Sequence, residues 1–208
     1  MNQELVSQFT QKAQAVSAIV TEVKSLKDAY AYAVDVCLNK EACQLLPSGC
    51  GEAVSDEAAA LCETKAGERV IAAPSLDDKQ FKELSAAAKK AGIKLVKDGM
   101  RNHLAGIDIG FCVADLGLAE TGSLVLDSSS EDLRLSTMVS EINVVVLPLS
   151  KLRATSYAAE DELLTMMRRT PNYLAFITGA SRTADIERVL AIGVHGPLEL
   201  HILLWRDA

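Results

Sequence analysis

Four consecutive apolar residues, Val144 to Leu147, limit the folds open to this chain more than any other feature. They lie in a predicted strand over 143–149. A strand with one solvated face alternates apolar and polar residues, so an uninterrupted run is typical of a strand covered on both faces. Such strands occur mainly in parallel sheets flanked by helices. The run therefore predicts an α/β fold.

A strand–helix–strand pattern earlier in the chain supports the same fold. The apolar run 69–73 stops at Pro74, a helix begins near Ser75, and Gly92 ends that helix before a second strand over 93–96. This alternation predicts parallel βαβ units in a mostly parallel sheet. Further strands are predicted over 107–113, 123–127, 173–178 and 198–204, with a helix over about 156–168.

The first quarter of the chain has a different pattern. Apolar residues at three- and four-residue spacing predict helix over 2–40, and the Pro- and Gly-containing stretch 46–51 predicts a loop. We therefore expect an N-terminal helical extension over 1–54 and an α/β domain over 55–208. The length of 208 residues suits one domain with such an extension.

Charge and cysteine content bear on the partners and cofactors of the chain. The formal net charge is −7, which disfavours nucleic acid as a partner. No apolar run approaches the roughly 20 residues that span a bilayer, and no signal peptide precedes the first helix, so we expect a cytoplasmic protein without a membrane span. The spacing of Cys37, Cys43, Cys50 and Cys62 fits neither common ferredoxin pattern. We expect this chain itself to bind no metal or other cofactor.

A polar loop over 114–123 is the first candidate site. Glu120 precedes a buried strand, and burial would raise its pKa and suit it to proton transfer, while an ionised Glu120 would be a nucleophile. Asp115, Thr121 and Gly122 are candidate substrate contacts, because glycine allows a ligand to approach the backbone. The alternative is that these residues only form a turn.

A second polar stretch, 178–187, follows a predicted strand and is expected to open a short helix. Ser181, Arg182 and Thr183 would offer donors to a carboxylate or phosphate at the helix N-terminus. Alternatively, Thr183 caps the helix and Arg182 pairs with a nearby acidic residue. His195, between glycines, is a further candidate for substrate binding that titrates near neutral pH, or else it bonds only the backbone of its turn.

Two of these stretches carry a family resemblance. Residues 119–126 and 178–197 resemble the two most recognisable parts of the LUD (lactate-utilisation) domain family, the second through its segments 181–187 and 193–197. The resemblance covers roughly 55–208. Many relatives carry a His at the start of the strand where this chain has Asn143. The resemblance implies a fold similar to the NagB/RpiA/CoA-transferase-like superfamily.

The same resemblance implies a function in the oxidation of L-lactate to pyruvate, beside two partners of which at least one carries iron–sulfur clusters. The expected role is an accessory component of that system, which binds a small anionic metabolite. Two alternatives stay open: a stand-alone acyl- or CoA-transferase that uses Glu120, and a sensor of small carboxylates or phosphates. The sequence also leaves open whether the chain forms a homo-oligomer.

Overall fold

The computed structural model describes residues 3–40, 55–57, 59–60, 63, 68–103, 106–183, 191–192 and 196–207. Its main element is a six-stranded sheet in the order β1-β12-β7-β4-β2-β3, in which every neighbouring pair is parallel. These strands are β1 (Ala18–Val23), β2 (Val70–Ala72), β3 (Lys94–Val96), β4 (Ile107–Val113), β7 (Ser140–Pro148) and β12 (Glu199–Trp205). The predicted parallel α/β fold is confirmed.

A smaller, four-stranded sheet lies beside the first, in the order β8-β5-β6-β9. Its strands are β5 (Leu116–Leu118), β6 (Ser123–Asp127), β8 (Leu152–Arg153) and β9 (Leu174–Ile177). The strand β6 is antiparallel to both β5 and β9, and β8 is parallel to β5. A short antiparallel pair joins β10 (Arg182–Thr183) to β11 (Ala191–Ile192).

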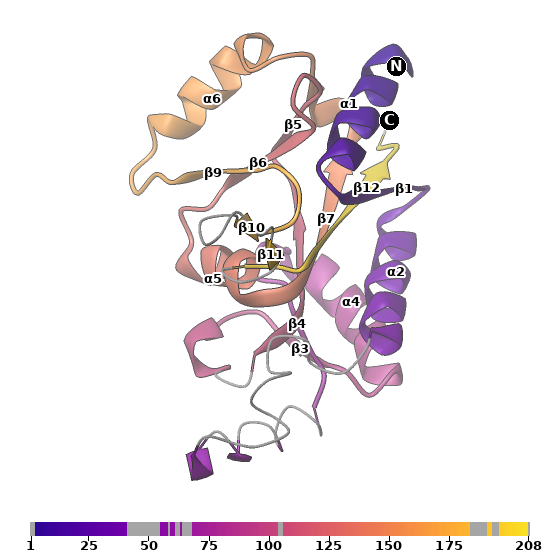
Figure 1. Cartoon of the computed structure of the whole chain (residues 1–208), viewed down its shortest axis with the longest axis vertical. Coiled ribbons are helices and arrows are strands. Elements are labelled where there is room, and N and C mark those ends of the chain that lie inside the picture. Colours follow the sequence, from indigo (N-terminus) through magenta and orange to yellow (C-terminus); the bar gives the residue numbers. More distant parts are fainter. Residues whose placement is uncertain are drawn as a thin grey trace.

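Helices cover both faces of the main sheet (Figure 1). They are α1 (Gln3–Ala15), α2 (Leu26–Asn39), α4 (Asp78–Lys90) and α5 (Glu131–Val139), with 3-10 turns at Met100–Asn102, Leu149–Lys151 and Tyr157–Ala159. Helix α6 (Glu160–Met167) packs instead on the small sheet, against Leu116, Leu118 and Val125. Residues of α2 and α4 pack on one face with Val144 and Val146, whereas α1 and β6 pack on the other with Val145 and Leu147. The apolar run in β7 thus contributes to two cores, as a strand buried on both faces must.

The N-terminal segment differs from the prediction of continuous helix. Helix α1 ends at Ala15, Ser17 takes a left-handed φ of 65°, and Ala18–Val23 forms the edge strand β1 beside β12. The β-branched residues Ile19, Val20 and Thr21 explain the strand, because their side chains favour extended backbone. The predicted boundary after residue 54 falls at residues outside the described part of the chain, and it stays a prediction.

Three other local predictions also need correction. The loop predicted over 114–122 contains β5, which pairs with β6 as a hairpin. The helix expected to begin within 178–187 is not formed at Arg182 and Thr183, which lie in β10. Helix α5 was not predicted, although Ser130 and the acidic pair that follows it are typical of a helix start.

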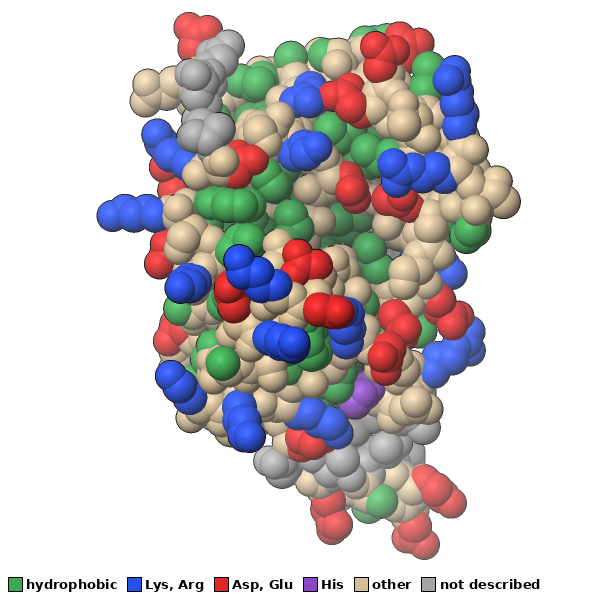
Figure 2. Space-filling model, turned by 180° about the vertical axis from the view of Figure 1, so that it is seen from behind, with side chains coloured by type: hydrophobic (Ala, Val, Ile, Leu, Met, Phe, Trp, Pro, Cys, Tyr) green, Lys and Arg blue, Asp and Glu red, His purple; other side chains and the backbone are tan. Residues whose placement is uncertain are grey.

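The surface on the opposite side from the view in Figure 1 is mixed in charge. Figure 2 shows acidic and basic side chains interspersed over this face, with hydrophobic side chains between them. Isolated apolar groups among charges of both signs are ordinary for a solvated protein surface. The interior cavities and buried polar groups are therefore the stronger candidates for a functional site.

Candidate functional site

The two predicted polar loops meet in the structure through a chain of three hydroxyl groups. The Ser123 hydroxyl donates to Thr121 Oγ1 over 2.7 Å, and Ser123 Oγ lies 2.6 Å from Thr178 Oγ1. The antiparallel pairing of β6 with β9 sets this contact, because it places the start of β6 against the end of β9. Ser123 and Thr178 are 55 residues apart in the sequence, and the pairing of β6 with β9 in the small sheet brings their loops together.

One loop packs closely on the last turn of α1, and the other on the turn that joins α1 to β1. A Cβ atom on Gly122 would lie 2.3 Å from the backbone nitrogen of Ala13, and one on Gly179 would lie 2.2 Å from the Val16 carbonyl oxygen. Arg182, the predicted anion-binding cation, donates through Nη2 to the same Val16 oxygen over 2.5 Å. In this structure the contact of Arg182 is therefore with the α1–β1 turn.

Glu120 fastens the β5–β6 turn to the segment that leads into α6. Its Oε1 accepts a hydrogen bond from the Ser156 backbone N–H over 2.7 Å, and its own N–H donates to the Ala154 carbonyl over 3.0 Å. The side chain is partly buried. The hydrogen bond from Ser156 thus ties the turn to this segment through one oxygen of the carboxylate.

Asp115 has a similar local role at the end of β4. Its Oδ2 accepts from the Asp127 backbone N–H over 2.7 Å, which ties the end of β6 to the start of the hairpin. Burial raises the pKa of Asp115 above its ordinary value, and the negative charge of the nearby Asp127 carboxylate adds to this rise. The hydrogen bond from the Asp127 backbone N–H and the charges of Lys151 and Arg169 act in the opposite direction without cancelling the rise.

A cavity of about 300 Å³ lies between α5, β9 and the first residues of β7 and β12. Its polar lining includes Ser128, Arg134, Asn143, Thr178 and Ser181, and its apolar lining includes Met138, Tyr173, Ala175, Phe176, Ile177, Pro197 and Leu200. Ser181, a predicted substrate-binding residue, thus faces a cavity large enough for a small organic molecule. Thr178 connects this cavity to the hydroxyl chain of the two loops.

Arg134 is the charged residue among the described residues that line this cavity. Its Nη1 donates to the carbonyl oxygens of Ser128 (2.6 Å) and Ser129 (3.0 Å), and its guanidinium lies 5.3 Å from the centroid of the Tyr173 ring. These contacts fix the guanidinium at the wall of the cavity. Sequence reasoning missed Arg134 because it missed α5, and the Ser–Glu–Asp start at residues 130–132 was the signal available.

Asn143, where the family resemblance implies a His in many relatives, lies in β7. Its side-chain amide donates to the Thr137 carbonyl over 2.9 Å, and its Oδ1 accepts from the Ser140 hydroxyl over 2.8 Å. Both partners lie at the junction of α5 and β7. Asn143 therefore ties the C-terminal end of α5 to the strand while it lines the cavity.

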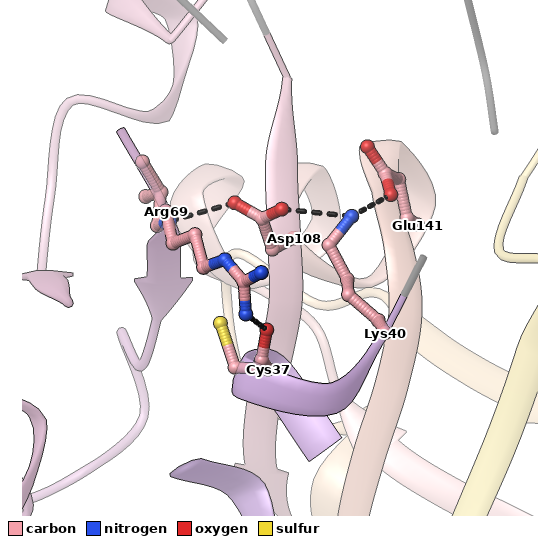
Figure 3. Close-up of polar contacts among 6 residues, drawn as sticks. Cys37, Lys40, Arg69, Asp108 and Glu141 are labelled. Carbon is pink, nitrogen blue, oxygen red and sulfur yellow. Dashed lines mark hydrogen bonds and ion pairs between the residues drawn. The ribbon is translucent and has the colours of Figure 1, made fainter. Parts of the chain in front are cut away.

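A second buried polar cluster lies at the amino ends of β4 and β7 (Figure 3). Lys40, just after α2, reaches between Asp108 (2.8 Å) and Glu141, and all three side chains are at most 7% exposed. Burial alone would lower the pKa of Lys40, but its hydrogen bonds to the two carboxylates raise it above its ordinary value. Nearby, Arg69 donates to the Cys37 carbonyl. This cluster was not predicted, and it borders a further cavity of about 470 Å³.

The remaining predicted residues fall partly outside what the structure describes. Thr183 lies in β10, but its side chain is outside the described part, and so is all of His195. Cys43, Cys50 and Cys62 are also outside it, whereas Cys37 is buried in the core. Among the described residues, no three His, Cys, Asp or Glu side chains are grouped as metal ligands. Within the same ranges, no helix is long and apolar enough to cross a membrane.

Comparisons with known proteins agree with the resemblance carried by residues 119–126 and 178–197. Lactate utilization protein C of Shouchella clausii is 38% identical over 94 residues, which are 44% of this chain and 41% of that relative. The protein of the same name from Exiguobacterium is 32% identical over 103 residues, 48% of this chain and 45% of the relative. The matches thus span less than half the length of these curated relatives.

A solved structure and a family model extend the likeness to the whole chain. A DUF162 family protein from Deinococcus radiodurans shares the fold, with a TM-score of 0.59 at 15% identity over 97% of this chain and 96% of that one. The family model described as the LUD domain matches residues 6–205. It begins well before the expected residue 55 and includes α1 and β1. The chain belongs to the LUD domain family.

Proposed function

We propose that this chain is an accessory component of a cytoplasmic system that oxidises L-lactate to pyruvate, beside partners that carry iron–sulfur clusters. Membership of the LUD domain family supports this role, as do relatives named lactate utilization protein C. In this proposal the redox centres belong to the partners. The chain contributes binding and positioning. Ser181 lines the cavity between α5 and β9, and ligand contacts by Thr121 and Gly122 are part of the same proposal.

The observation that favours an accessory role over a transferase is the hydrogen bond that the Glu120 carboxylate accepts. Its carboxylate accepts the Ser156 backbone N–H over 2.7 Å. This bond holds Oε1 and turns the carboxylate toward the segment that leads into α6, so Oε2 alone remains to meet a substrate. Arg182 is engaged with the Val16 carbonyl in the same manner. Substrate contacts by Asp115, Arg182, Thr183 and His195 stay proposals.

The test is to purify a tagged copy from its own host and to assay the eluate for L-lactate-dependent dye reduction. We expect iron-containing partners in the eluate together with the activity. Glu120→Gln keeps an oxygen that can accept from Ser156, so an accessory role predicts unchanged activity. A lone, iron-free protein with acyl-transfer activity that disappears in Glu120→Gln would establish the transferase alternative instead.

A further inference from the structure

The cavity between α5 and β9 holds a guanidinium whose surroundings are prepared for an anion. Within the described residues, the Arg134 side chain forms no ion pair, and its side-chain hydrogen bonds all run from Nη1 to the Ser128 and Ser129 carbonyls. The Tyr173 ring covers it at 5.3 Å. The nearby Glu131 carboxylate feels the Arg134 charge, but its ion pair is with Arg101, so the side-chain hydrogen bonds of Arg134 go to neutral carbonyls and its charge is available to a ligand.

A buried hydroxyl beside the same cavity is a second group that could bond an anion. Ser128 is 0% exposed and lines the cavity, and among the described residues its Oγ has no hydrogen-bond partner. Its backbone is fixed on both sides, since its N–H donates to the Tyr173 carbonyl and its carbonyl accepts from Arg134. Buried polar groups in proteins are almost always satisfied, so a hydroxyl beside a cavity that bonds no group in the described part of the chain is a donor that a ligand can engage.

From this geometry we propose that the cavity binds a monocarboxylate with an apolar body, whose carboxylate accepts hydrogen bonds from Arg134 and Ser128. One cation among the described lining residues matches one negative charge better than the two of a phosphate monoester. Met138, Phe176 and Pro197 form an apolar wall that a ligand as small as lactate would leave largely uncovered. Ser181 lies on the same cavity wall and is a further donor. This inference does not depend on the accessory role.

The experiment titrates the full chain with phenyllactate by calorimetry. L-lactate, inorganic phosphate and the neutral analogue 3-phenyl-1,2-propanediol are titrated in parallel. We expect phenyllactate to bind at least about tenfold more tightly than each of the three, because only it supplies both the charge and the apolar body. Equal affinity for the neutral diol, preference for phosphate, or no binding of phenyllactate would overturn the proposal.

Two variants connect the binding to the residues. Arg134→Met keeps an unbranched stem beside Tyr173 and is expected to weaken phenyllactate binding at least about tenfold. Arg168→Met is the matched control, because Arg168 is exposed and does not line the cavity. Unchanged affinity in Arg134→Met would overturn the assignment.

Ser128→Ala is a second variant, which tests the binding proposal even if Arg134→Met does not fold. The ligand-free melting temperature of Ser128→Ala should not fall, since the lost hydroxyl has no partner in the described structure, while the phenyllactate affinity should drop roughly tenfold. A merely structural serine would show the reverse pattern, with a lower melting temperature and unchanged affinity. The lactate-dependent dye assay of the host complex is read separately, so either proposal can fail alone.

Discussion

At the scale of single residues, the two loops that carry the family resemblance connect the small sheet to α1 and to the turn after it. Gly122 lets its loop touch the backbone of α1, and Gly179 lets its loop touch the turn after α1. The hydroxyls of Thr121, Ser123 and Thr178 link the two loops to each other. Because a Cβ atom on Gly122 or Gly179 would collide with this backbone, close packing as well as conformation requires glycine at both positions.

Gly122→Ala separates these two requirements when it is compared with Gly92→Ala. Both glycines have a left-handed φ (67° and 69°), but a Cβ on Gly92 meets nothing within 4 Å. We expect Gly92→Ala to lower the free energy of unfolding by about 1 kcal/mol and Gly122→Ala by more than about 3 kcal/mol, because Ala13 backbone cannot move without α1. Urea denaturation measures both values. Equal losses would mean that the contact with Ala13 is easily relieved.

At the scale of elements, Lys40 joins α2 to the amino ends of two central strands. Its ammonium lies between Asp108 on β4 and Glu141 on β7 (Figure 3). Asp108 also accepts the Val70 backbone N–H over 2.7 Å, so the cluster extends to β2. Removing the lysine would leave two buried carboxylates near each other without their shared cation.

Lys40→Met should therefore lower the free energy of unfolding by about 3–5 kcal/mol. The exposed pair of Lys94 with Glu68 provides the control, and Lys94→Met should change stability by less than about 1 kcal/mol. Adding Glu141→Gln to Lys40→Met should restore part of the loss, because one of the two buried charges is then removed. Chemical denaturation at neutral pH checks all three variants. A loss in Lys40→Met as small as that of the control would show that the cluster adds little to stability.

Strong local patterns predicted elements well, and competing patterns explain the failures. The strands at 107–113 and 123–127 and the buried run of β7 were predicted because period-two and continuous apolar patterns have few alternative explanations. β1 was missed because Val16, Val20 and Val23 have helical spacing although they span a helix end and a strand. Because α5 was not predicted, Arg134 was not identified as a candidate residue. The pairing of β6 with β9 joins loops that are distant in the sequence, and a local pattern cannot predict it.

At the scale of the whole molecule, the first forty residues complete both faces of the main sheet. Phe9 and Ala13 of α1 are fully buried in the core that contains Val145 and Leu147, and Ala33 and Cys37 of α2 are fully buried in the core on the opposite face. β1 pairs with β12 along its whole length, from Ala18 to Val23. The segment therefore supplies an edge strand and part of each core.

A chain that begins at residue 55 tests whether the expected domain over 55–208 folds alone. We expect it to lose cooperative unfolding and to bind a hydrophobic dye, because β12 loses its pairing with β1 and both cores lose fully buried side chains. Adding the 1–54 fragment should restore a cooperative transition, since the packing surfaces on the larger fragment are then covered. Circular dichroism during urea denaturation follows both samples, with the full chain as reference. A cooperative transition of the shorter chain alone would instead establish residues 1–54 as an extension, and would make β1 and α2 additions to a sheet that is stable without them.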